Sequence, residues 1–268
     1  MLFATTHFKY LYHGGCIMLK NFAEENFDII IQAGQSNSNG GGYGDVCDPY
    51  IPNEDVWYLN SNFVITLATE AVNENRIQSN FSLSFANEYI KNGLLEKGRK
   101  ILIIRAAVGG TGFLDNRWGL NDDLFLRMME MIKTALELNS NNRLVAFLWH
   151  QGEADAILYA SYETHYKNLL TLINTVRNSF DCKDLPVVAG DFVEHWKKDN
   201  LDMCEPVVKA IVDVCNDIGN AKFVYTDDLL SNSQAHVWED IIHFSRESLY
   251  KLGKKYFKAY QEIRINNK

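Results

Sequence analysis

The chain has 268 residues, of which 47% are hydrophobic and 22% are charged, a balance typical of a globular protein with a sizeable core. The formal net charge of −8 disfavours nucleic acid or a membrane surface as a partner, since both require a basic face. A neutral or weakly charged substrate fits better, and the composition does not define an oligomeric state.

The first seventeen residues do not resemble a signal peptide, because they lack a charged n-region and a continuous apolar run. A cytoplasmic location is therefore expected. Met18 is an alternative start, since the codons of Gly14-Gly15 can spell a ribosome-binding sequence a few codons upstream. We expect residues 1–17 to be a leader or a mis-assigned start, and residues 18–268 to form a single domain.

Apolar runs of strand length alternate with segments of helical period, which is typical of βαβ units in a parallel sheet. The predicted strands cover residues 28–33, 100–106, 144–149, 185–189 and 222–225. The predicted helices cover residues 82–95, 122–138, 160–179, 205–218 and 245–263. Every apolar run is too short to span a membrane. The alternation predicts one α/β domain with at least five strands.

Two segments of this pattern carry more specific expectations. Residues 37–67 are rich in glycine and irregular, so we expect short β pieces that cover a site. In the last predicted helix, apolar residues repeat every three or four positions, which places one face on the sheet. These residues are Leu249, Leu252, Tyr256 and Tyr260. Ser245 can cap that helix at its start.

The cysteines indicate neither a disulfide framework nor a thiolate zinc site, because they are odd in number and show no CxxC spacing. We expect reduced structural thiols at Cys16, Cys47, Cys182, Cys204 and Cys215.

The first predicted strand ends at Gly34-Gln35-Ser36-Asn37, where open α/β sheets bind ligands. A serine hydroxyl needs an activating base. His243 is the best candidate, because Asp240 precedes it by three residues and one turn can bring the carboxylate to Nδ1. A serine in a turn and an Asp-His pair on the surface are the alternatives to catalysis.

Two further polar segments follow predicted strands. Residues 149–155, with the sequence WHQGEAD, form the densest polar cluster, in which the Gln151 amide suits a developing oxyanion. In the segment Gly109-Gly110-Thr111, glycine lets backbone N–H groups approach a ligand closely. The glycine spacing of phosphate-binding and dinucleotide-binding loops is absent, so no nucleotide site is expected.

Taken in chain order, these four segments resemble the SGNH hydrolase superfamily. More narrowly, they are similar to its branch of sialate O-acetylesterases and acetylxylan esterases, which are carbohydrate esterases. The resemblance spans Asp28 to about Tyr260. It implies a flavodoxin-like, three-layer α/β/α sandwich with a parallel sheet of about five strands. It also implies that no metal or organic cofactor is needed.

The resemblance implies a role for each matching residue. Ser36 corresponds to the nucleophile, and Asp240 and His243 to the acid and the base. The Ser36 N–H, the Gly110 N–H and the Gln151 side chain correspond to the oxyanion donors, although which glycine of the pair donates stays open. Supporting positions are Gln35, Asn37, Gly109, Thr111, His150 and Glu153. Ser38 stands where many members carry Met.

The expected activity is hydrolysis of an O-acetyl ester on a carbohydrate of the acetylxylan or sialic acid type. Side chains expected to contact the sugar are Trp57, Tyr58, Arg117 and Trp118, and packing within the domain is the alternative. Two other functions stay open. One is a non-catalytic carbohydrate-binding protein on an esterase fold. The other is a metal-dependent hydrolase using His150, Glu153, Asp155 or His195.

Overall fold

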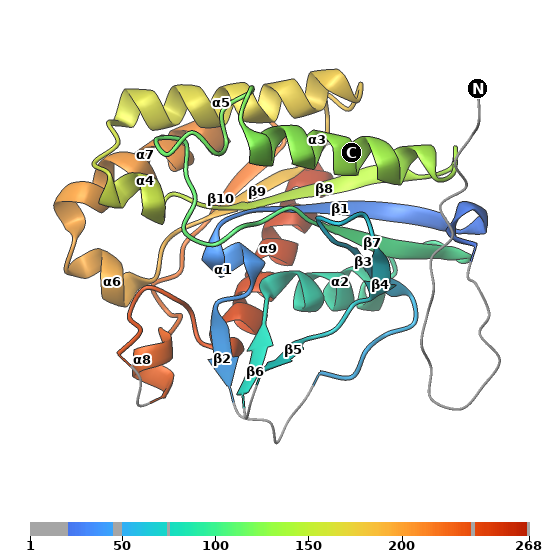
Figure 1. Cartoon of the computed structure of the whole chain (residues 1–268), viewed down its shortest axis with the longest axis horizontal. Coiled ribbons are helices and arrows are strands. Elements are labelled where there is room, and N and C mark those ends of the chain that lie inside the picture. Colours follow the sequence, from blue (N-terminus) through green and yellow to red (C-terminus); the bar gives the residue numbers. More distant parts are fainter. Residues whose placement is uncertain (1–20, 45–49, 74–75, 237–238, 267–268) are drawn as a thin grey trace.

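The apolar runs of the sequence form the middle of a central sheet that lies between two layers of helices (Figure 1). This computed structural model describes residues 21–44, 50–73, 76–236 and 239–266. Within them the sheet has seven strands in the order β10-β9-β8-β1-β7-β3-β4. The strands are β1 (Asn26–Gly34), β3 (Val56–Leu59), β4 (Ile65–Leu67), β7 (Arg99–Arg105), β8 (Arg143–His150), β9 (Val187–Gly190) and β10 (Ala221–Val224).

All neighbours in this sheet pair in parallel except β3 and β4. Strand β1 is the central element, and Ile29, Ile30 and Ile31 are fully buried in it because helices cover both faces of the sheet. The chain adds β7 and β3 on one side of β1 and β8 on the other. This reversal opens a crevice at the carboxyl ends of the three central strands, where open α/β sheets bind ligands.

Two long helices cover one face of the sheet, α2 (Phe81–Lys91) and α9 (Arg246–Asn266). The other face carries α3 (Asp123–Glu137), α5 (Tyr162–Ser179) and α7 (Leu201–Asp217) (Figure 1). Short elements complete the described chain: η1 (Phe22–Glu24), α1 (Ser36–Asn39), α4 (Glu153–Ile157), α6 (Glu194–Lys198) and α8 (Asn232–Ala235). A second sheet pairs β2 (Gly42–Gly44), β6 (Arg76–Ser79) and β5 (Ala71–Asn73).

The packing of α9 agrees with its sequence pattern. Leu249, Leu252, Tyr256 and Tyr260 are all buried, so the predicted face lies against the rest of the domain. Ser245 Oγ accepts a hydrogen bond from the Ser248 N–H at 3.2 Å, which satisfies a backbone donor at the helix start. The predicted cap and the predicted apolar face are therefore both confirmed.

The layered α/β architecture is confirmed, and the seven strands agree with the expected minimum of five. The two further strands, β3 and β4, lie inside the irregular segment 37–67 and join the edge of the sheet. Instead of covering a site, β3 pairs with β7, and Val56 lies opposite Ile101. Strands of four and three residues are too short to show a period, and their pairing partners are distant in sequence.

The expectations about the leader, Met18, Cys16 and Cys47 concern residues outside the described ranges. The three described cysteines, Cys182, Cys204 and Cys215, are free thiols. In the part of the chain that the structure describes, every helix is too short or too polar to cross a bilayer.

Candidate active site

Ser36, His243 and Asp240 form one hydrogen-bonded chain of side chains. The Nε2 atom of His243 lies 2.8 Å from Ser36 Oγ. On the other side of the ring, Nδ1 lies 2.9 Å and 3.0 Å from the two carboxylate oxygens of Asp240. In this arrangement an imidazole can take the proton of a serine hydroxyl while the carboxylate stabilises the resulting charge.

The three residues come from opposite ends of the described chain. Ser36 is the first residue of α1, directly after β1, and the Asp240–His243 turn lies before α9. The turn is local, because Asp240 Oδ1 also accepts from the His243 backbone N–H at 3.1 Å. Asn232 donates to Asp240 Oδ2 at 2.9 Å and holds the carboxylate from the α8 side.

Two pKa shifts follow from this geometry. Burial raises the pKa of Asp240, but the hydrogen bonds from His243 and Asn232 outweigh it, so the net shift is downward. Burial lowers the pKa of His243, and the hydrogen bond and charge of Asp240 outweigh it, so the net shift is upward. The pair therefore favours an ionised carboxylate beside an imidazole that readily accepts a proton.

Asn37 connects three segments around the triad. Its Nδ2 donates to Glu153 Oε1 at 2.7 Å and to the Ile242 carbonyl at 3.1 Å. Its Oδ1 accepts from the Phe244 N–H at 3.0 Å. Asn37 thus ties α1 to α4 and to the loop that carries His243. Glu153 is fully buried, and burial raises its pKa.

The glycine turn after β7 lies beside the nucleophile. The Val108 N–H donates to the Gly34 carbonyl at 3.0 Å, which draws the turn to the end of β1. A Cβ on Gly109 would lie 3.6 Å from Ser36 Cβ, and Gly110 adopts the left-handed region with φ of +69°. Within the described residues, the backbone N–H groups of Ser36, Gly109 and Gly110 have no protein acceptor, so they are available to a ligand.

The turn is held by its own side chains. Thr111 Oγ1 donates to the Val108 carbonyl at 2.8 Å and accepts from Trp118 Nε1 at 3.0 Å. Trp118 is fully buried and packs edge-on against Trp149. The expected supporting position of Thr111 is therefore a structural contact that shapes the glycine turn.

The Gln151 side chain differs from expectation. It is fully buried, and its Nε2 donates to Asp155 Oδ2 at 2.8 Å and approaches the Thr111 carbonyl at 3.3 Å. A charged acceptor holds an amide hydrogen more strongly than a neutral one does. The hydrogens that were expected to face an oxyanion therefore point into the domain.

His150 does not compete with His243 as a base. It is fully buried, burial lowers its pKa to about 3, and its Nδ1 hydrogen-bonds Tyr256 Oη at 2.9 Å. His195 Nδ1 pairs with Ser231 Oγ at 3.0 Å in a separate pocket. Among the described residues, no three His, Cys, Asp or Glu side chains are grouped so that they could hold a metal ion.

The expected sugar-contacting side chains do not line the pocket of Ser36. Trp57 and Tyr58 are buried in β3, where Trp57 packs edge-on against Phe22. Arg117 pairs with Asp123 at 2.8 Å. Trp57, Tyr58 and Trp118 are therefore packed within the domain, where aromatic rings contribute to the core. Arg117 instead forms an ion pair at the surface.

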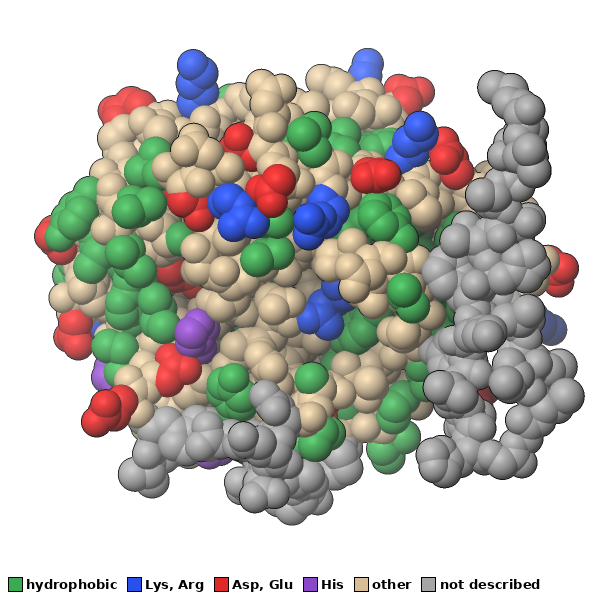
Figure 2. Space-filling model, viewed as in Figure 1, with side chains coloured by type: hydrophobic (Ala, Val, Ile, Leu, Met, Phe, Trp, Pro, Cys, Tyr) green, Lys and Arg blue, Asp and Glu red, His purple; other side chains and the backbone are tan. Residues whose placement is uncertain are grey.

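The pocket at the triad has a volume of about 580 Å³. It is lined by Gln35, Ser36, Gly109, Gly110, Asp115, Ala154, Ile157, Leu158, Ile242 and His243. Hydrophobic side chains gather on the side of the molecule that carries α4 (Figure 2), and Ile157 and Leu158 are about half exposed there. This apolar wall was not expected from the sequence, since an apolar pair at a helix end carries no signal of its own.

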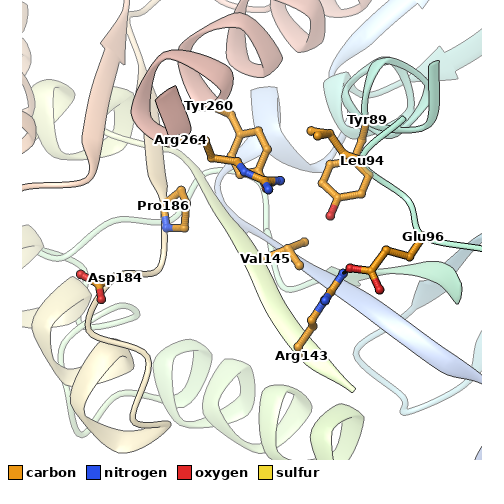
Figure 3. Close-up of a pocket in the computed structure, with 9 residues that line it drawn as sticks. All are labelled: Tyr89, Leu94, Glu96, Arg143, Val145, Asp184, Pro186, Tyr260 and Arg264. Atoms are coloured by element: carbon orange, nitrogen blue, oxygen red, sulfur yellow. Dashed lines mark hydrogen bonds and ion pairs between the residues drawn. The ribbon is translucent and has the colours of Figure 1, made fainter. Parts of the chain in front are cut away.

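A second pocket, of about 370 Å³, lies at the opposite, amino-terminal end of the strands (Figure 3). Arg143 in this pocket pairs with Asp28 at 2.7 Å and with Glu96 at 2.8 Å, so its charge is balanced within the protein. The first pocket is therefore the candidate active site.

Comparisons with known proteins agree with this geometry. The family model described as carbohydrate esterase, sialic acid-specific acetylesterase, matches residues 26–262. A probable carbohydrate esterase of Arabidopsis thaliana is 28% identical over 106 residues, which are 40% of this chain and 39% of that protein. A probable 9-O-acetyl-N-acetylneuraminic acid deacetylase of Escherichia coli (strain K12) is 26% identical over 89 residues, which are 31% of this chain and 27% of that protein. The matched stretches thus span well under half of either relative.

The crystal structure of NanS superposes with a TM-score of 0.77 and 16% identity, covering 91% of this chain and 99% of that one, which supports the fold. The match to the family model covers most of the chain, from the start of β1 to the last turn of α9. The chain therefore belongs to the carbohydrate esterase family of sialic acid-specific acetylesterases.

Proposed function

We propose that the protein is a serine esterase that removes O-acetyl groups from a carbohydrate. The observation that carries the proposal is the hydrogen-bonded chain from Ser36 Oγ through His243 to Asp240, which opens on the pocket. A hydroxyl with a base and an oriented carboxylate is the apparatus of acyl transfer. Membership of a carbohydrate esterase family supports both parts of the proposed substrate, the ester bond and the sugar that carries it.

In the proposed acylation step, Ser36 Oγ attacks the acetyl carbonyl carbon while His243 Nε2 takes the hydroxyl proton. The carbonyl oxygen becomes an oxyanion, which the N–H groups of Ser36 and Gly110 stabilise. The tetrahedral intermediate collapses, and the C–O bond to the sugar breaks. His243 returns its proton to the sugar oxygen, so an acetyl-enzyme and a free sugar hydroxyl result.

Deacylation repeats the sequence with water. His243 takes a proton from a water molecule, which attacks the acetyl carbon attached to Ser36 Oγ. A second tetrahedral intermediate collapses and releases acetate, and the proton returns to Ser36 Oγ. Asp240 remains ionised throughout, consistent with the lowered pKa that its hydrogen bonds produce against the effect of burial.

The sugar is proposed from the relatives. The Escherichia coli relative is named for an O-acetylated sialic acid, so an acetyl ester of a sialic acid is the first candidate substrate. An acetylated xylan is the second candidate, because the sequence resembles acetylxylan esterases as well. The apolar wall of Ile157 and Leu158 suits the methyl group of the acetyl ester and the C–H faces of a sugar ring.

Replacement of the nucleophile tests the proposal. We expect Ser36→Ala to abolish hydrolysis of p-nitrophenyl acetate, of 9-O-acetylated sialic acid and of acetylated xylan. The variant removes the hydroxyl that lies against His243 Nε2 and that attacks the ester. The matched control is Ser140→Ala, which removes an exposed serine hydroxyl far from the site. Full activity of Ser36→Ala would contradict the proposal, as would an inactive wild-type protein against the whole panel.

Labelling separates catalysis from mere binding of a carbohydrate. A fluorophosphonate should label wild-type protein stoichiometrically at Ser36, since the reagent reports an activated serine. An unlabelled protein that still binds the sugar would favour a non-catalytic binding protein. A cytoplasmic location also stays a proposal, and fractionation of cells that express the protein tests it.

A further inference from the structure

Gln35 reaches along the wall of the active-site pocket next to the nucleophile. Its side-chain oxygen, Oε1, accepts from the Ala154 N–H at 3.0 Å and from the Gly152 N–H at 3.4 Å. The Gln151 amide approaches the same oxygen at 3.5 Å. The residue is 3% exposed, so its conformation is held by the protein.

These contacts determine which way the amide of Gln35 points. Turning the amide over would place an NH₂ group against the N–H donors of Gly152 and Ala154, with no hydrogen bond gained. The oxygen must therefore face the start of α4. The nitrogen, Nε2, lies on the other side, and within the described residues it has no acceptor. Its two hydrogens remain available at the pocket wall.

Gln151, by contrast, has already used its donors. Its Nε2 donates to Asp155 and lies against the Thr111 carbonyl, and it does not line the pocket. The two glutamines therefore differ in what they can do. Gln151 contributes to the position of Gln35, whereas Gln35 alone of the two offers free amide hydrogens to a bound molecule.

We propose that the side-chain amide of Gln35 donates a hydrogen bond to the carbonyl oxygen of the bound ester. Together with the N–H groups of Ser36 and Gly110 it completes the oxyanion hole, a role that the sequence pattern places on Gln151. This inference rests on the proposed esterase function. The N–H groups that bind Oε1 polarise the amide, which strengthens its donation from Nε2.

The hydrogen bond gains strength as the reaction proceeds. A neutral carbonyl oxygen accepts weakly, whereas the oxyanion of the tetrahedral intermediate accepts strongly. A donor that is already oriented in the free enzyme therefore lowers the barrier more than it improves substrate binding. Loss of the donor should reduce kcat and leave KM nearly unchanged.

The test is Gln35→Glu. Glutamate keeps the shape of the side chain and an oxygen that can accept from Ala154, but it replaces the donor nitrogen with an oxygen. We expect kcat to fall by about 100-fold to 1,000-fold, the usual effect of removing one oxyanion donor. The fall should be similar for p-nitrophenyl acetate and for an acetylated sugar, because both present the same carbonyl group.

Two further variants serve as comparisons for Gln35→Glu. Gln261→Glu makes the same chemical change on α9, where Gln261 contacts only the side chain of Asn92 at 3.3 Å among the described residues, and should keep wild-type kcat. Gln35→Met removes the amide without adding charge and should also lose kcat. Circular dichroism melts confirm that the variants are folded. A wild-type kcat in Gln35→Glu or Gln35→Met contradicts the inference, and so does a loss confined to the sugar substrate.

Binding of an alkyl boronic acid separates this inference from the proposed function, since the boronate forms a tetrahedral adduct on a serine. The boronate should bind Gln35→Glu about 100-fold more weakly than it binds the wild-type protein. Equal affinities contradict the role of Gln35. A wild-type protein that binds the boronate more tightly than the variant but hydrolyses no acetyl ester contradicts the proposed function alone.

Discussion

His243 is surrounded by groups that leave its imidazole little freedom. Asp240 binds Nδ1, Ser36 binds Nε2, and Gly41 packs against the ring. A Cβ on Gly41 would lie 2.8 Å from the His243 ring, so a larger residue there would displace the imidazole. The chemistry therefore depends on one tautomer of one histidine, with the proton on Nδ1 facing the carboxylate.

We predict that Asp240→Asn lowers kcat for p-nitrophenyl acetate by about 10⁴-fold, as in other serine hydrolases with this triad. An amide in place of the carboxylate favours the wrong tautomer and no longer stabilises the imidazolium. The matched control is Asp227→Asn, which makes the same change at an exposed position and should keep wild-type kcat. An unchanged kcat in Asp240→Asn would remove Asp240 from the mechanism.

A pH profile tests the role of Glu153. The proposed base is neutral His243, so kcat/KM should rise with pH through the pKa of His243, which the structure shifts above 6.5. Burial lowers this pKa, and the charges of Asp240 and Glu153 raise it. Glu153→Gln removes a negative charge and should therefore move the midpoint of the rise to lower pH. The variant keeps an oxygen for Asn37, and an unmoved midpoint would show that the Glu153 charge does not act on His243.

The helix α9 determines where the His243 loop lies, and one buried ion pair anchors its start. Arg246 donates to Glu70 Oε1 at 2.7 Å, and Tyr250 Oη donates to the same oxygen at 3.0 Å. Glu70 Oε2 accepts from the Tyr50 N–H at 2.8 Å. Glu70 precedes β5, so the pair joins the small sheet to the element that follows the triad.

We predict that Glu70→Gln lowers the free energy of unfolding by about 3 kcal/mol, because it removes one charge of a buried ion pair and leaves the charge of Arg246 less compensated. Urea unfolding measures the change. Glu137→Gln is the control, since its exposed pair with Lys133 at 3.8 Å should contribute less than about 1 kcal/mol.

The stability that the Glu70–Arg246 pair contributes should depend on pH in a definite direction. Burial raises the pKa of Glu70, and its hydrogen bonds with Arg246 and Tyr50 outweigh this effect, so the folded pKa lies below 4.5. A group with a lowered folded pKa contributes stability above its unfolded pKa and loses it as the pH falls through the folded value. The difference between wild type and Glu70→Gln should therefore shrink in acid. A difference that stays constant down to pH 2 would contradict this account.

The whole molecule has a formal net charge of −8, and its candidate active site lies at one end of the sheet. The triad pocket lies at the carboxyl ends of β1, β7 and β8, and the second pocket lies beside the amino end of β8, where Arg143 and Val145 line it (Figure 3). Charges far from the pocket still create a field at low ionic strength, where the Debye length is about 30 Å at 0.01 M salt. Substrate charge therefore matters for association.

We predict that added salt separates the two candidate sugars. A sialic acid carries a carboxylate, so a negatively charged protein repels it, and kcat/KM should rise as salt increases from 0.01 M to 0.15 M. An acetylated xylan fragment is neutral and should show no change, as should p-nitrophenyl acetate, which serves as the control. A decrease for the sialic acid would indicate a positive field at the pocket that outweighs the net charge.

Several features were predictable from sequence because their cause is local. The long apolar runs became β1, β7 and β8, since a strand buried on both faces needs such a run. The spacing of Asp240 and His243 also predicted their contact, because three residues form a single turn. In contrast, β3 and β4 were not identified as sheet strands, since strand pairing depends on residues distant in sequence.

The sequence by itself determined the alternation of strands and helices, the position of Ser36 at a strand end, and the pairing of Asp240 with His243. Tertiary structure decided which polar and aromatic groups face the substrate. Trp57 and Trp118 pack inside the domain, and Gln151 turns toward Asp155, while the amide nitrogen of Gln35 has no acceptor among the residues that the structure describes. The reason is physical: an amide points its hydrogens according to the acceptors around it, and those acceptors come from segments that only the fold brings together.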